Sequence, residues 1–150
     1  MSRLVGVDHG SRRIGLAVGD TETGLAFARP ALRRRNADAD VAAIGQLART
    51  EGAERIVLGL PRNMDGSEGP QAAAARAFGE RLAAAIGLAV VYVDERLSSW
   101  EAGERLAAAG RRPRRASGEL DSAAARLILQ EYLDALHRPD PPAAIPQEAE

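Results

Sequence analysis

The spacing of apolar residues changes along the chain and divides it into elements. Three short apolar runs open the sequence, at residues 3–8, 14–19 and 25–31. Turn-forming residues separate these runs: Gly10 and Ser11 lie in the first gap, and Asp20 and Gly24 bound the second. Short apolar runs divided by such turns predict three antiparallel strands joined as hairpins.

The pattern then becomes helical in four segments. The predicted helices cover residues 38–50, 70–87, 98–109 and 119–136. Pro70 at the start and Gly87 at the end suit a helix, because proline fixes a helical φ and glycine accepts a left-handed one. Ser98 and Glu101 have the spacing of a capping box and open the third helix. In the fourth helix, Ser122 and Gln130 fall on the wetter face, away from the apolar stripe.

Two continuous apolar runs lie between these helices. Residues 55–60 and 88–93 are apolar on both faces, the pattern of parallel strands covered on both sides. The element order β-β-β-α-β-α-β-α-α predicts an α/β fold. Its mixed five-stranded sheet has three antiparallel strands plus two parallel ones, with helices on both faces. Ligands of such sheets bind at the carboxyl ends of the parallel strands.

The length and the end of the chain indicate one domain with a tail. At 150 residues the chain is long enough for a single hydrophobic core. Residues 139–150 are acidic and rich in proline, so we expect a disordered tail there. We therefore expect one domain over residues 1–138 and a tail over residues 139–150.

Composition excludes several kinds of site. The chain has no cysteine, which excludes disulfides and thiolate metal sites and is typical of a reducing compartment. No apolar run is long enough for a signal peptide or a membrane span, so we expect a cytoplasmic protein that does not bind membranes. Net charge is −1 and all 20 basic residues are arginine, so only clusters of arginine can indicate a polyanionic partner.

Three acidic residues are candidates for a metal site. Asp8 and Glu95 end predicted strands, and Asp121 lies on the inward face of the last predicted helix, with Ala125 one turn later. The helix dipole alone also explains an acid at position 121. Converging carboxylates suit Mg²⁺ or Mn²⁺, and two such ions can promote phosphodiester hydrolysis. Asp94 competes with Glu95, because neighbours on an extended strand face opposite ways.

Four sequence blocks carry a resemblance to a known family. They read VDHGSRRIGLAVGD, GLPRNMDGSEGP, VDERLSSWEA and DSAAARLILQEYL, and they occur in this order between residues 7 and 133. Together they resemble the motifs of the YqgF (RuvX) family of RNase H-like proteins, described as Holliday junction resolvases and as nucleases that mature the 5′ end of pre-16S rRNA. The resemblance implies that Asp8, Glu95 and Asp121 form an acidic triad. It also implies a role near the site for residues 63–66, without saying which.

Other residues are candidates for contacts with nucleic acid. Gly10 and Ser11 follow Asp8 and would let a phosphate approach the backbone closely; a tight turn explains them equally well. Arg96 adjoins Glu95. A cluster of four arginines precedes Asp121 and could neutralise phosphates, namely Arg111, Arg112, Arg114 and Arg115. We interpret the arginines at 33–35 as a solvated loop, and we expect His9 to face away from Asp8.

The sequence thus favours a divalent-metal-dependent endonuclease acting on structured nucleic acid, either in pre-16S rRNA processing or in Holliday junction resolution. Two alternatives remain open. One is a nucleic-acid-binding ribosome-assembly factor without catalysis. The other, less favoured because 150 residues supply one domain where two are needed to enclose ATP, is an ATPase of the sugar-kinase or actin type. The choice between RNA and DNA, and between monomer and homodimer, stays open.

Overall fold

Five strands form one mixed sheet. The computed structural model describes residues 2–94 and 119–137, and only the backbone of residues 119–121. The strands are β1 (Arg3–His9), β2 (Arg13–Asp20), β3 (Ala26–Arg33), β4 (Ala53–Leu60) and β5 (Ala89–Asp94). Their order across the sheet is β3-β2-β1-β4-β5. The β1–β2 and β2–β3 pairs are antiparallel and the β1–β4 and β4–β5 pairs are parallel, which confirms the predicted sheet.

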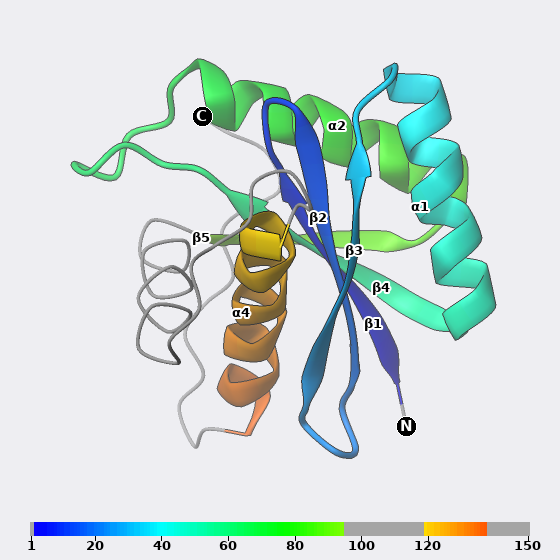
Figure 1. The fold of residues 1–150 in the computed structure, drawn as a ribbon. Helices are drawn as coiled ribbons and strands as arrows, with labels where there is room; N and C mark the ends of the chain where they lie inside the picture. The colour runs from blue at the N-terminus through cyan, green and yellow to red at the C-terminus, as the bar shows by residue number, and fades with distance from the viewer. Residues whose placement is uncertain (1, 95–118, 138–150) are drawn as a thin grey trace.

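Helices cover both faces of this sheet (Figure 1). Helices α1 (Ala37–Glu51) and α2 (Pro70–Ile86) pack on one face, and α4 (Glu119–Leu136) packs on the other. Each face has its own apolar core. The core under α1 and α2 includes Val5 and Val7 of β1, whereas the core under α4 includes Leu4. The side chains of β1 thus alternate between two buried layers.

The helix ends follow the local chemistry of the sequence. Asn36 caps α1, because its side-chain oxygen accepts a hydrogen bond of 2.8 Å from the backbone N–H of Ala39. Gly52 ends the same helix with a φ of 65°, in the left-handed region that glycine tolerates. Pro70 begins α2 and Gly87 follows its last residue, as the sequence predicted.

Helix α4 corrects one detail of the sequence analysis. Its helical spacing places Ser122 and Gln130 on the side away from the apolar stripe, yet both contact β3 and the turn before it. The buried Ser122 hydroxyl donates to the carbonyl of Arg29 at 2.6 Å. The Gln130 amide accepts from the Ala26 N–H at 2.9 Å and donates to the carbonyl of Gly24 at 2.6 Å. This polar side therefore holds the edge of the sheet.

Three predicted segments lie outside the described residues: the helix at 98–109, the basic loop at 110–118 and the tail at 139–150. None of the helices described in the two ranges is long and apolar enough to cross a membrane.

Candidate active site

Asp8 is a buried carboxylate near the carboxyl end of the central strand. Its exposed fraction is 8%. Strand residues alternate between the two faces of a sheet, so Asp8 shares a face with Leu4 and Gly6. Leu4 belongs to the core under α4, and a Cβ added to Gly6 would lie 2.8 Å from Cβ of Leu129 in α4. Asp8 is therefore directed to the α4 side of the sheet.

The first turn of α4 comes level with Asp8. Near the start of β1, Leu4 pairs with Gly19, and a Cβ added to Gly19 would lie 3.1 Å from the Leu133 side chain, late in α4. Further along β1, a Cβ added to Gly6 would lie 3.1 Å from the carbonyl oxygen of Ala125, earlier in α4. The helix consequently runs antiparallel to β1. Asp8 is two strand residues beyond Gly6, roughly 6.6 Å, and position 121 is four helical residues before Ala125, about 6 Å. These nearly equal steps bring position 121 opposite Asp8.

Asp94 belongs to the other face of the sheet. On β5, Val90 and Tyr92 pack in the core under α1 and α2, while Val93 packs against the core under α4. By the same alternation Asp94 falls on the α1 and α2 side, opposite to Asp8. This alternation disfavours Asp94 as the partner of Asp8 and leaves Glu95 as the candidate.

A pocket of about 360 Å³ opens beside Asp8, between the strand ends and the first turns of α2. The residues that line it come from the end of β1, the segments that follow β1, β3 and β4, and the start of α2; they are Asp8, His9, Gly10, Ser11, Arg34, Pro61, Pro70, Gln71 and Ala74. The N-terminus of α2 has no side-chain cap. Because backbone N–H groups are exposed at such an end, the pocket has a local preference for anions.

Arg34 is the pocket residue that the sequence analysis missed. The arginines at 33–35 are exposed, as a solvated segment predicts, and Arg34 also lies against the turn that follows Asp8. Its guanidinium donates to the carbonyls of Gly10 and Ser11 at 3.1 and 3.3 Å. Its backbone N–H donates to the carbonyl of Arg12 at 2.9 Å. No local signal distinguishes Arg34 from its neighbours, because the contact depends on the pairing of β2 with β3.

Gly10 forms a tight turn. Its N–H donates to the carbonyl of Arg13 at 3.0 Å, and a Cβ at this position would lie only 2.5 Å from the same oxygen. The turn therefore requires glycine, whatever contact a ligand makes there. Ser11 is exposed at the rim.

His9 faces α2, on the side opposite to Asp8. Its ring stacks on Phe78, with ring centroids 4.5 Å apart. Burial, and secondarily the positive charge of Arg34, lowers the pKa of His9 below its ordinary value. His9 is therefore neutral at pH 7 and adds no positive charge to the pocket.

The side chains of the other predicted site residues lie outside the described part of the chain. Position 121 is described by its backbone alone. Among the described side chains there is no cluster of three or more acidic, histidine or cysteine residues suited to a metal ion. The remaining predicted residues are not described and stay predictions: Glu95, Arg96, Arg111, Arg112, Arg114 and Arg115.

Comparison with solved structures defines the fold class. The Thermus thermophilus RuvC structure in complex with a Holliday junction superimposes with a TM-score of 0.61 at 13% identity, covering 95% of this chain and 100% of that one. The large terminase nuclease of phage G20c superimposes with a TM-score of 0.54 at 16% identity, covering 87% and 81%. The fold is thus RNase H-like, as the resemblance implied.

Sequence comparison then identifies the family. The model of the RuvX family, described as Holliday junction resolvase, matches residues 2–135. A protein of Anaeromyxobacter dehalogenans strain 2CP-1 is 50% identical over 132 residues, covering 88% of this chain and 96% of its own. One from Moorella thermoacetica is 47% identical over 134 residues, covering 89% and 96%. Both are named "Putative pre-16S rRNA nuclease". The chain belongs to the RuvX family, a family of nucleases.

Proposed function

We propose that this protein is a divalent-metal-dependent endonuclease that hydrolyses phosphodiester bonds in structured nucleic acid. Asp8, Glu95 and Asp121 are its proposed metal ligands. The supporting observation is the buried Asp8 carboxylate at the end of β1, directed to the face where the first turn of α4 comes level with it. The names of the relatives point to pre-16S rRNA as substrate, and the family description points to the Holliday junction.

The donor set fits Mg²⁺ or Mn²⁺. The three carboxylates provide oxygen ligands, which hard divalent cations prefer, and the chain has no cysteine that could supply a thiolate. A carboxylate as buried as Asp8 is costly unless it is paired with a positive charge, a hydrogen-bond donor or a metal. Bound cations, two in our proposal, would supply charge stabilisation to an in-line phosphodiester displacement.

The residues beside Asp8 would position the substrate backbone. Arg34 holds the turn at Gly10 and Ser11 and contributes a positive charge to the pocket. We propose that a phosphate next to the scissile one lies against this turn. Arg96 and the arginines at 111–115 would contact phosphates on the α4 side, because they flank Glu95 and precede Asp121 in the sequence.

The direct test is a cleavage assay on two substrates. A four-way DNA junction and an RNA carrying the 5′ precursor extension of 16S rRNA are incubated with the protein. We expect cleavage with Mg²⁺ or Mn²⁺, its loss in excess chelator and its return when the metal is restored. The substrate that is cut identifies the activity, and the mass of the complex in solution shows whether a dimer is needed. Cleavage that persists in chelator would contradict the proposal.

An Arg34→Gln variant tests the positioning role of the pocket. Without the guanidinium, the turn after Asp8 loses two hydrogen bonds and the pocket loses its positive charge, so we expect kcat/KM for cleavage to fall about tenfold, the equivalent of about 1.4 kcal/mol. The matched control is Arg35→Gln, which removes the same charge from an exposed neighbour that does not line the pocket. Equal effects of the two substitutions would show that only overall charge matters.

A further inference from the structure

The loop between β4 and α2, residues 61–69, extends away from the body of the molecule (Figure 1). It leaves the carboxyl end of β4, which is the neighbour of β1 in the sheet. Pro61 at its start and Pro70 just after its end line the pocket beside Asp8. The loop therefore begins and ends at the proposed active site. The loop contains residues 63–66, for which the family resemblance implies a role near the site but does not say which.

The base of this loop is held by an ionic cluster. Both carboxylate oxygens of Glu68 accept hydrogen bonds from Arg76, at 2.7 and 2.8 Å, and Arg62 adds a longer one of 3.5 Å. Arg76 is itself buried and lies over the Tyr92 ring, 5.1 Å from its centroid. The hydrogen bonds from Arg76 lower the pKa of Glu68, so the cluster is ionised at neutral pH. The base is thus attached firmly to α2 and β5.

The tip of the loop is closed by its own hydrogen bonds. The N–H of Asn63 donates to the carbonyl of Ser67 at 2.8 Å, and the N–H of Gly66 donates to the carbonyl of Asn63 at 2.8 Å. Asp65 accepts from both the N–H and the hydroxyl of Ser67, at 2.9 and 2.6 Å. Gly66 has a φ of 89°, which favours glycine. These hydrogen bonds brace the backbone of the tip.

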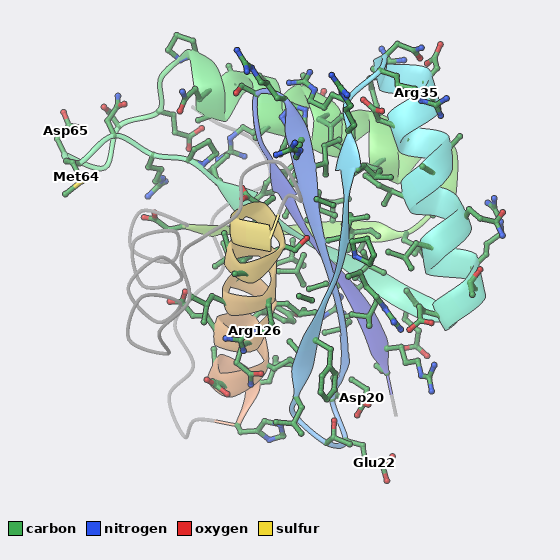
Figure 2. All side chains as sticks on the ribbon, viewed as in Figure 1. Asp20, Glu22, Arg35, Met64, Asp65 and Arg126 are labelled. Carbon is green, nitrogen blue, oxygen red and sulfur yellow. The ribbon has the colours of Figure 1, made fainter. Side chains whose placement is uncertain are left out.

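This braced tip presents an apolar side chain to solvent. Met64 is 81% exposed, whereas the other exposed large apolar side chains in the described residues, Leu25, Phe27 and Leu136, are 45–59% exposed. Figure 2 shows Met64 and Asp65 at the outer end of the loop, directed away from the sheet. One methionine is far smaller than a protein interface, which needs roughly 800 Å² from each partner. A single side chain can instead contact one nucleobase, because apolar side chains including methionine insert between base steps in other complexes.

We propose that Met64 packs against a nucleobase of the substrate that is unpaired or displaced from its stack. This inference rests on the proposed nuclease function and adds a substrate preference to it. A continuous duplex offers no exposed base face, whereas a junction, a bulge or a helix end does. The loop would therefore select nucleic acid with interrupted stacking, in RNA and in DNA alike, because both present the same base faces.

The test compares Met64→Ala with the parent on two probes. One is a duplex with a single bulged 2-aminopurine and the other is the same duplex fully paired, each made as RNA and as DNA. Binding is measured with Ca²⁺ replacing Mg²⁺, to slow cleavage. We expect Met64→Ala to weaken binding of the bulged probe about tenfold, in the range of one base-stacking contact, and to abolish the change in 2-aminopurine fluorescence. Binding of the paired probe should change by less than about twofold.

Two variants serve as controls. Met64→Leu keeps an apolar side chain of similar volume and should retain most of the preference for the bulge. Leu25→Ala shortens an exposed apolar residue beside β3, far from the pocket, and should have no effect.

The outcomes separate this inference from the proposed function. If the parent cuts nucleic acid in a metal-dependent way but Met64→Ala keeps the full preference for the bulge, the inference is wrong and the nuclease function stands. If the preference depends on Met64 but nothing is cut, the nuclease function fails and the loop remains a base-binding element. A parent that binds neither probe would overturn both.

Discussion

An Asp8→Asn protein is expected to cut its substrate at least about a thousandfold more slowly than the parent. Asparagine has nearly the shape of aspartate but no charge, so it cannot replace a carboxylate that holds a divalent cation. A cation contributes several kcal/mol to the stabilisation of a phosphodiester transition state, and about 4 kcal/mol corresponds to a thousandfold in rate. Single-turnover cleavage at saturating metal measures this effect without interference from product release.

Asp94→Asn is the matched control for this experiment. It makes the same chemical change at the end of β5, on the face of the sheet opposite to Asp8. We expect its cleavage rate to stay within about threefold of the parent, a change of less than about 1 kcal/mol. Thermal unfolding of both variants verifies that each is folded. An Asp8→Asn protein that cuts as fast as the parent, or an equal loss in Asp94→Asn, would refute the proposed ligand set.

The elements of the fold were predictable because their signals are local. A change in the spacing of apolar residues separates helices from strands. Proline and glycine mark the two ends of α2. The predicted bounds of β5 were shifted by one residue from Ala89–Asp94. The apolar period does not specify at which residue a strand ends, because the last pair of β5 is set by the neighbouring strand β4.

The contacts that order the site were not predictable in the same way. Arg34 contacts residues 10 and 11 because β2 and β3 pair in one particular register. Three consecutive arginines in the sequence do not indicate that register. Ser122 and Gln130 of α4 looked solvent-facing because helical periodicity separates faces but does not reveal which element lies against each face. These interactions join residues 23 to 106 positions apart.

Asp8 lies between these two cases. Sequence placed an acid at the end of an apolar strand, and the alternation along β1 shows which face it occupies. The same alternation on β5 disfavours Asp94, a choice that the sequence left open. The places of Glu95 and of the Asp121 side chain stay predictions; the backbone position of α4 supports the second of them.

Replacing Gly6 with alanine tests that position of α4 directly. The added Cβ would lie 2.8 Å from Cβ of Leu129 and 3.1 Å from the carbonyl of Ala125, and neither atom can move unless the helix moves. We expect a loss of about 2 kcal/mol in the free energy of unfolding, as for other overpacked cores. This loss lowers Tm by about 4–8 °C in a chain of this size. Because α4 carries position 121, we also expect at least a hundredfold slower cleavage at a temperature where the variant is folded, since an error of about 1 Å in a catalytic group has that effect.

Gly45→Ala provides the contrast. Gly45 lies in the middle of α1, and a Cβ there would be 3.4 Å from the Ile86 side chain, an ordinary packing distance. Because alanine favours a helix more than glycine does, this variant should be more stable by about 0.5–1 kcal/mol and cut at the parent rate. A Gly6→Ala protein that is destabilised but fully active would separate the packing of α4 from catalysis. Asp121 would then lose its structural support as a ligand, and a third carboxylate would have to come from another part of the chain.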